Sequence, residues 1–166
     1  QAMGGIMGIT GPTPGGAPTK VGPGVGDILP AMFLAYGTVA ACLRAQRTGR
    51  GQFVDVAMVD GVLAVCERIV YQYSVTGVAP GPEGNGHPLI APFGLFPASD
   101  GHVSLGIPRD NFWQAFCQTI GRPELASDPR YATSEARLAH RAEVDAIVSG
   151  WTSRHTKHEL GEILGG

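Results

Sequence analysis

The residue in this chain best suited to chemistry is Asp27, which follows the glycine-rich run GPGVG at positions 22–26. Glycines let another stretch of backbone or a ligand approach closely, because they carry no side chain. A predicted helix begins directly after Asp27, and the positive end of a helix dipole stabilises a carboxylate as the anion. A carboxylate held ionised can act as a nucleophile. The alternative is that Asp27 is only a helix N-cap, a position where Asp is common.

A second candidate is the loop of residues 81–88, with the sequence GPEGNGHP. Loops on a rigid scaffold often carry binding residues, and some close over a site as a lid. We therefore take Gly84, Asn85, Gly86 and His87 as candidate substrate-binding residues. The alternative is that this segment is an ordinary connection between two elements.

Other motifs predict no metal and no bound cofactor. His155 and His158 have no third ligand nearby in the sequence, which a zinc site would need. The glycines at 22, 24 and 26 lack the preceding strand and the spacing of a nucleotide-binding loop. No Gly-x-Ser-x-Gly nucleophile motif is present.

The helix expected to position Asp27 covers Ile28 to Arg47, with Asp27 at the N-cap and Pro30 in the first turn. It is apolar on nearly every face, so we expect it to be buried on most sides. A turn at 48–51 leads into residues 52–58, which alternate in polarity and predict a strand. Residues 59–75 predict a second helix.

The elements after the candidate loop predict a hairpin followed by helices. Strands are expected at 94–98 and 102–107 around the turn Ser99-Asp100-Gly101. Helices are expected at 111–120 with Asp110 as cap, at about 134–151, and from about Thr156, where Glu159 completes a capping box. Helices and strands together predict a mixed α/β chain.

Composition excludes several classes of protein. The net charge is −2 without a basic block, so nothing predicts nucleic-acid binding. No apolar run is expected to reach the roughly 18 residues of a membrane helix. Charged residues make up 16% of the chain, below the roughly 25% of typical domains, so we expect other protein to cover part of the surface. Cys42, Cys66 and Cys117 lie in apolar stretches, which predicts buried thiols and a cytoplasmic protein.

The ordered series of motifs resembles the class III CoA-transferases, the CaiB/BaiF type. This family includes formyl-CoA transferase, carnitine CoA-transferase and alpha-methylacyl-CoA racemase. The resemblance is carried by Gly26-Asp27, RTGRGQFVDVAM at 47–58, GNGHP at 84–88, APF at 91–93, Phe96, Asp100-Gly101, Val103, GRPEL at 121–125, DPRYAT at 128–133, Arg137 and His140-Arg141.

This resemblance implies a fragment of a two-domain fold, in agreement with a chain that starts without Met and stops at Gly165-Gly166. Residues 1–75 would be the C-terminal part of the large, doubly wound domain and its helical exit. Residues 76–92 would be a Gly/Pro-rich linker with the active-site loop, and 93–166 a truncated small domain of a hairpin and helices. The family forms interlocked dimers, so a homodimer is expected, and the fragment is expected to be inactive alone.

The resemblance also implies the chemistry. Asp27 matches the catalytic aspartate of the transferases, which attacks an acyl-CoA thioester and passes through an aspartyl-CoA thioester before a carboxylic acid accepts the CoA. Coenzyme A enters as a substrate thioester, with no further cofactor. Residues 84–86 match a glycine loop that closes over the site. The formyl-CoA transferases have more glycines there, which argues against formyl or oxalyl specificity.

Two alternatives stay open at the level of sequence. One is a 2-methylacyl-CoA racemase of the same family, in which the matching Asp works with a His and a Glu at the acyl α-carbon. The His would lie upstream of this chain, and residues 107–111 (IPRDN) hold no Glu, although Asp110 could substitute. The other alternative is a non-catalytic structural or dimerisation module.

Overall fold

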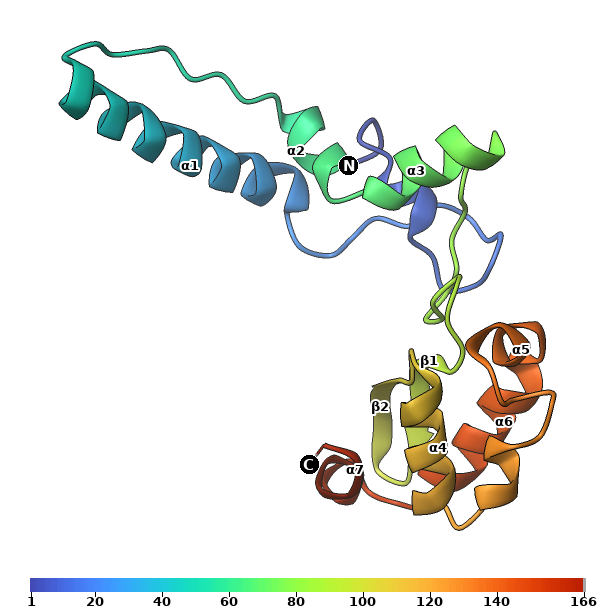
Figure 1. The fold of residues 1–166 in the computed structure, drawn as a ribbon. Coiled ribbons are helices and arrows are strands. Elements are labelled where there is room, and N and C mark those ends of the chain that lie inside the picture. The colour runs from blue at the N-terminus through green and yellow to red at the C-terminus, as the bar shows by residue number, and fades with distance from the viewer. Residues whose placement is uncertain (166) are drawn as a thin grey trace. The chain divides into compact units, whose positions relative to one another are not determined.

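The chain folds into two compact units, the first spanning Gln1–Gly84 and the second starting at Asn85 (Figure 1). This computed structural model describes residues 1–165, apart from the side chain of Glu67. The boundary between the units falls within the linker predicted at 76–92, and it divides the candidate loop between them. The assignment of residues 1–75 and 93–166 to a large and a small domain stays a prediction.

The first unit is dominated by α1 (Val25–Thr48), which follows the short 3-10 turn η1 (Ile6–Ile9) and an irregular segment rich in Gly and Pro. The helix starts at Val25 rather than Ile28, and Pro30 lies inside it rather than in its first turn. It ends at Gly49, whose φ of 69° is left-handed and whose N–H donates to the Ala45 carbonyl at 2.8 Å. Glycine adopts this conformation without steric cost, so the predicted turn at 48–51 is confirmed.

The strand predicted at 52–58 is wrong. Residues 50–57 are extended but have no partner strand among residues 1–165. They contact α1 instead: Arg44 Nη1 donates to Gln52 Oε1 at 2.9 Å, and a Cβ added to Gly37 would lie 2.8 Å from Val54. The alternating pattern predicted the extended backbone correctly, but a strand also needs a neighbour that supplies the ladder of hydrogen bonds.

Two helices, α2 (Met58–Ala64) and α3 (Glu67–Thr76), replace the single helix predicted for 59–75. The chain turns at Val65 and Cys66, where each N–H donates to the carbonyl three residues back, at 3.2 and 2.9 Å. This turn leaves both Val62 and Cys66 buried. Apolar periodicity did not reveal the break, because apolar residues recur at helical spacing before it, at Val62, and after it, at Ile69 and Val70.

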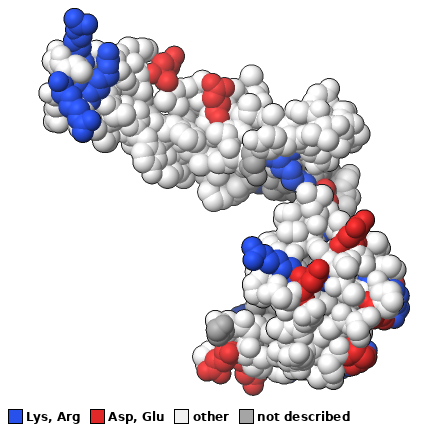
Figure 2. Space-filling view, in the orientation of Figure 1, with Lys and Arg blue, Asp and Glu red and all other residues white. Residues whose placement is uncertain are grey.

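The expectation that α1 is buried on most sides is wrong for this chain by itself, since only Pro30 and Ala41 of the helix are buried. Figure 2 shows uncharged surface over much of α1 and a gathering of basic side chains at its C-terminal end. Large apolar side chains are exposed along its length: Ile28, Met32, Phe33, Leu34, Tyr36, Val39 and Leu43. By length and composition alone α1 could also cross a membrane. The prediction that no apolar stretch reaches the length of a membrane helix is therefore wrong. Core helices of soluble proteins pass the same test.

The second unit begins with an antiparallel hairpin of β1 (Phe93–Ala98) and β2 (Gly101–Gly106). The register runs from Phe93↔Gly106 to Ala98↔Gly101, so the predicted hairpin is confirmed. Gly101 has a φ of 145°, which favours glycine at the end of the turn. Asp100 Oδ1 accepts from the Lys157 N–H at 2.8 Å and ties this turn to the start of the last helix.

Five helical elements follow the hairpin: α4 (Asp110–Thr119), η2 (Pro123–Ala126), α5 (Ser134–Ala139), α6 (Arg141–Thr152) and α7 (Lys157–Leu164). The capping box of Thr156 and Glu159 is confirmed. The N-cap of α4 is Arg109 rather than Asp110, and the single helix predicted at 134–151 is divided in two at His140. Asp110 instead accepts a hydrogen bond from Arg137, a buried residue on α5. Capping rules do not predict this contact, because the two residues are far apart in the sequence.

The helices of the second unit enclose one apolar core with β1 and β2. Its buried members are Phe96, Ile107, Trp113, Phe116, Cys117, Leu125, Tyr131, Val144 and Val148. Trp113 is fully buried and its Nε1–H donates to the Leu125 carbonyl at 3.4 Å, which satisfies its polar atom. A closed core of this kind holds the elements after the candidate loop in fixed positions.

The cysteines divide between core and surface. Cys66 and Cys117 are buried as predicted, whereas Cys42 is exposed on α1, so that prediction is wrong for Cys42. Burial raises the pKa of the Cys117 thiol to about 11. A thiol with so high a pKa is protonated at neutral pH and is a poor nucleophile.

Candidate active site

Asp27 lies in the first turn of α1 as its third residue, and its side chain is exposed. The N-cap is Gly24, so the prediction that Asp27 itself caps the helix is wrong. The N–H groups of Asp27 and Ile28 both donate to the Gly24 carbonyl, at 3.0 and 2.9 Å. A Cβ added to Gly24 would lie 3.5 Å from Asp27 Oδ2, so glycine leaves one side of the carboxylate open.

The segment before Asp27 is held by the side chain of Gln1. Its Nε2 donates to the carbonyls of Val21 and Pro23 at 3.4 and 3.3 Å, and its Oε1 accepts from the Val21 N–H at 3.1 Å. A Cβ added to Gly26 would lie 3.9 Å from Gln1, at ordinary contact distance. Gln1 therefore fixes the approach to α1, and no motif in the sequence indicated this role.

The N-terminal turns of α1 are held from the other side by α2. A Cβ added to Gly61 would lie 3.0 Å from the Cα, Cβ and Cδ atoms of Pro30, so the two backbones approach as closely as glycine allows. Pro30 is buried and stands three residues after Asp27. This contact sets the position of the helix end that carries the carboxylate.

The arrangement around Asp27 suits a nucleophile that attacks a carbonyl. The carboxylate is reachable from solvent, lies at the positive end of a 24-residue helix, and is preceded by Gly24 and Gly26, which carry no side chains. Backbone N–H groups at such a helix end can also stabilise an oxyanion that forms when the carbonyl is attacked. A residue that served only as a cap would bond its side chain to the first-turn N–H groups, and no such bond is present within the described part of the chain.

The candidate loop is divided between the two units. Gly84 belongs to the first unit with Asp27, whereas Asn85, Gly86 and His87 belong to the second. Gly84 has a φ of 65°, and a Cβ there would lie 2.9 Å from the Pro12 carbonyl oxygen, so only glycine fits this position without strain. Asn85 and Gly86 are exposed.

His87 is held against the start of β1. Its N–H donates to the Phe93 carbonyl at 3.0 Å, and its ring lies 5.1 Å from the Phe93 ring at 56°. Its Nδ1 accepts from the Leu89 N–H at 3.1 Å. His87 thus shapes the turn that follows the loop.

Two arginines that sequence reasoning did not single out as functional bind the chain just after the loop. Arg141 donates to the carbonyls of His87 and Ile90, and Arg137 donates to the carbonyl of Ala91. Both residues contributed to the family resemblance, but no spacing rule connects positions about 50 apart in the chain.

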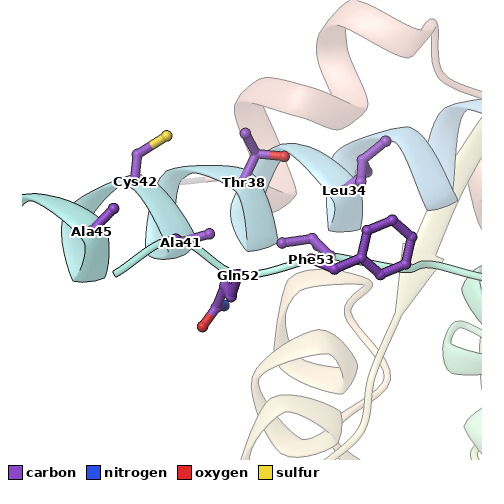
Figure 3. Close-up of a pocket in the computed structure, with 9 residues that line it drawn as sticks. Leu34, Thr38, Ala41, Cys42, Ala45, Gln52 and Phe53 are labelled. Carbon is purple, nitrogen blue, oxygen red and sulfur yellow. The ribbon is translucent and has the colours of Figure 1, made fainter. Parts of the chain in front are cut away.

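A groove lies farther along α1, between the helix and the extended segment that follows it (Figure 3). Its volume is about 350 Å³, and its lining includes Leu34, Thr38, Ala41, Cys42 and Phe53. Leu34 is seven residues beyond Asp27, roughly 10 Å along a helix at 1.5 Å per residue. The groove is therefore separate from the candidate nucleophile.

Metal ligands do not gather in the part of the chain that the structure describes, where no group of three His, Cys, Asp or Glu side chains could hold an ion. His158 lies on the surface 3.5 Å from Glu162, and His155 Nδ1 lies 3.1 Å from the Trp151 carbonyl oxygen.

Comparison with known proteins gives matches along the whole chain. The model of CoA-transferase family III matches residues 1–166. The chain is 44% identical over 166 residues to succinyl-CoA:mesaconate CoA-transferase of Haloarcula marismortui, and 41% identical over 165 residues to succinyl-CoA–D-citramalate CoA-transferase of Chloroflexus aurantiacus. These matches cover 100% and 99% of the chain but 41% of each relative's length.

The fold is also similar to that of a solved CaiB/BaiF family protein from Brucella suis, with a TM-score of 0.79 and 33% sequence identity. This likeness covers 99% of the chain and 43% of the solved structure. It confirms the predicted fold class, in which these helices and strands form a fragment of the class III CoA-transferase fold.

Proposed function

The chain belongs to CoA-transferase family III, and from that premise we propose that it carries the nucleophile of an acyl-CoA:carboxylate CoA-transferase, with Asp27 as the attacking residue. The observation that carries this proposal is the exposed carboxylate in the first turn of α1, preceded by Gly24 and Gly26 and without a side-chain capping bond. Since the chain spans 41% of its relatives' length, other parts of the whole protein would supply most contacts to CoA.

The proposed reaction proceeds through two covalent species on Asp27. A carboxylate oxygen attacks the thioester carbonyl of the donor, CoA leaves as the thiolate, and a mixed anhydride forms. The thiolate then attacks the aspartyl carbonyl, which releases the donor acid and leaves an aspartyl-CoA thioester. The acceptor carboxylate repeats these two steps in reverse, so that the acyl-CoA product leaves and the Asp27 carboxylate is restored. No proton or water is consumed.

We propose succinyl-CoA as the donor and a methyl-branched dicarboxylate as the acceptor. Both relatives described above are named for succinyl-CoA, and their acceptors, mesaconate and citramalate, are five-carbon dicarboxylates that carry a methyl branch. Coenzyme A would enter as a substrate thioester, with no other cofactor. The loop with Gly84, Asn85, Gly86 and His87 would contact the acyl-CoA, and the protein would act as a homodimer in the cytoplasm.

The geometry at Asp110 favours transfer over racemisation. A racemase would need a second acid or base, and Asp110 is the candidate substitute for the missing Glu. Its Oδ1 accepts from Arg137 Nη2 at 3.0 Å, and Arg137 is fully buried. Asp110 therefore serves as the hydrogen-bonded partner of a buried guanidinium group, which favours a structural role for it over that of a second acid or base.

The experiment that tests the proposed function traps the covalent intermediate. The full-length protein is incubated with succinyl-CoA and then with hydroxylamine, and peptides are searched by mass spectrometry for a hydroxamate at Asp27. The matched control is Asp60, also an acid in the first turn of a helix. A hydroxamate at Asp27 and not at Asp60, with transfer to mesaconate lost in Asp27→Asn and kept in Asp60→Asn, supports the proposal. Near-normal transfer by Asp27→Asn would refute it.

A further inference from the structure

The residues that follow the candidate loop are fastened by the side chain of one arginine. His87 and Ile90 form an antiparallel bridge, which closes a tight turn at 87–90. Arg141 Nη2 donates to the carbonyl oxygens of both residues that close this turn, and the bond to Ile90 is 3.1 Å long. The guanidinium group of Arg141 therefore joins the two ends of a turn that lies more than 50 residues earlier in the sequence.

The position of Arg141 is not explained by the stability of its own helix. Arg141 is the first residue of α6, where a cation faces the positive end of the helix dipole. Glu143 in the same turn has the sign that suits that end. Hydrogen bonds from a charged donor are about twice as strong as neutral ones, so the contact with the turn offsets the unfavourable position.

The carboxylate of Asp145, on the same helix as Arg141, interacts with it electrostatically. Asp145 is one helical turn beyond Arg141 and half-buried, and its Oδ1 has no hydrogen-bond partner within the described residues. Burial raises the pKa of Asp145, and the positive charge of Arg141 opposes that rise. The guanidinium group therefore donates to the turn carbonyls and also interacts electrostatically with Asp145.

Arg137, one helix earlier, provides a contrast. It is fully buried, donates to Ala91 O at 3.2 Å, Tyr131 O at 3.0 Å and Asp110 Oδ1 at 3.0 Å, and lies over the Trp113 ring. Its bonds hold the chain inside the core of the second unit. Arg141 is half-buried, and its hydrogen bonds within residues 1–165 go to the turn next to the exposed tip.

Residues 87–90 are thereby fixed while the preceding two stay exposed. Gly94 has no room for a Cβ, which would lie 2.7 Å from the Asn85 carbonyl oxygen, so the loop backbone lies directly on β1. The Leu89 N–H donates to His87 Nδ1 and completes the turn. The tip at Asn85 and Gly86 is left as the reachable part, with its direction determined by the turn behind it.

We propose that Arg141 is a positioning residue for the acyl-CoA loop: it fixes the turn at 87–90 and thereby the conformation in which Asn85 and Gly86 meet the substrate. This rests on the proposed function for the role of the loop. Arg141 hydrogen-bonds the backbone of the turn, so its effect on the reaction would pass through the loop backbone. Misplacement of a positioning segment by about 1 Å can reduce turnover by as much as a hundredfold.

The test compares Arg141→Gln with Arg130→Gln in the full-length protein. Arg130 is an exposed arginine of the same unit that pairs with Asp128 and Glu143 and makes no bond to the loop. We expect amide hydrogen exchange in residues 85–92 to become about tenfold faster in Arg141→Gln and to stay unchanged in Arg130→Gln, with α4 protected in both. Equal exchange in the two variants would overturn the proposal.

Kinetics provides the second readout. With succinyl-CoA and mesaconate we expect kcat/KM to fall about tenfold in Arg141→Gln, with partial recovery in Arg141→Lys, which keeps the charge and one donor. Faster loop exchange with unchanged kcat/KM would overturn the role in the reaction. If Arg141→Gln does not fold, exchange in Arg141→Lys against Arg130→Lys decides the matter. Absence of transfer by the wild-type protein would refute the proposed function, while the exchange comparison would still test the fixation of the loop by Arg141.

Discussion

The second unit buries its large apolar side chains in one cluster, whereas the first unit leaves most of its own exposed. Trp113, Phe116 and Val148 are almost inaccessible in the second unit. In the first, Tyr36 and Val39 on α1 are 73% and 70% exposed. Burial of a large apolar side chain contributes about 1.5–3 kcal/mol, so the second unit has the means to fold by itself.

The first unit instead brings several of its segments together at glycines, which let neighbouring residues approach closely. Gly61 lies against Pro30, Gly4 against Val62, and Gly37 against Val54. Such contacts fix geometry but bury little apolar area. The unit carrying Asp27 therefore has close internal contacts within this chain, while the apolar side chains of α1 are left uncovered by the other described residues. We expect other parts of the full-length protein to cover them.

The largest expected effect is from truncating an aromatic side chain in each unit of the 166-residue chain. Trp113→Ala should destabilise the second unit by about 4 kcal/mol, because it leaves a cavity and removes the bond to Leu125. Tyr36→Ala should change stability by less than about 0.5 kcal/mol, because that ring is exposed. Urea unfolding followed by circular dichroism measures both. Similar losses would contradict the contrast between the units.

The next prediction compares the chain with the full-length protein. Val39→Asp should leave the stability of the 166-residue chain nearly unchanged, since the side chain already faces solvent. In the full-length protein the same substitution should cost about 3 kcal/mol, because it would bury a charge without a partner. Thermal unfolding of both proteins, with Arg47→Asp on the same helix as a control, makes the measurement. An equal response in the two proteins would show that α1 stays exposed.

The same contrast decides how much of the fold was predictable. In the second unit, the hairpin turn and the capping box at Thr156 were predicted correctly, because each depends on residues close in sequence. The strand at 52–58 and the burial of α1 were predicted wrongly, since both depend on a neighbour that the first unit does not contain. Breaks at Cys66 and His140 were missed because the apolar pattern continues across them.

In the candidate site, too, local features were predictable from the sequence and contacts between distant residues were not. Asp27 was singled out as a candidate from local features, the glycines before it and the helix after it, and its place in the first turn differs from the predicted N-cap. The contacts of Gln1 with Val21 and of Arg141 with His87 join residues 20 and 54 positions apart, and no periodicity predicts them. The sequence indicated candidate residues, but it did not indicate which side chains hold the segments next to them in place.

Two glycine-to-alanine substitutions, one in each unit, should change the stability of the units in opposite directions. Gly61→Ala should destabilise the first unit by about 2 kcal/mol, because the new Cβ would lie 3.0 Å from the Cα, Cβ and Cδ atoms of Pro30. Gly150→Ala on α6 meets nothing within 4 Å and should stabilise the second unit by up to about 1 kcal/mol through helix propensity. Melting temperatures of the two variants, which should move in opposite directions, provide the measurement.

A smaller effect is expected at the capping box of the second unit. Thr156 Oγ1 accepts from the Glu159 N–H at 3.3 Å, and Thr156→Ala removes this cap at a cost of about 1 kcal/mol. Thr156→Ser keeps the hydroxyl and should retain most of the stability. Urea unfolding of the two variants checks this, and an equal loss in both would show that the hydroxyl contributes nothing.

The smallest expected effect is a pH dependence carried by Glu159. Hydrogen bonds from the Thr156 N–H and hydroxyl hold the pKa of this carboxyl below its ordinary value of 4.5. A carboxyl whose pKa is lower in the folded state stabilises the fold at pH values above its unfolded pKa, and this stabilisation is lost as the pH falls through the folded pKa. Wild type should therefore exceed Glu159→Gln in stability at pH 7, and the difference should shrink as the medium is made acidic. Unfolding by urea across this range, with Glu162→Gln on the same helix as the control, measures it. A difference that stayed constant with pH would mean that the charge of Glu159 does not strengthen the cap, and that this end of the second unit is held by the Thr156 hydroxyl and the Asp100 contact alone.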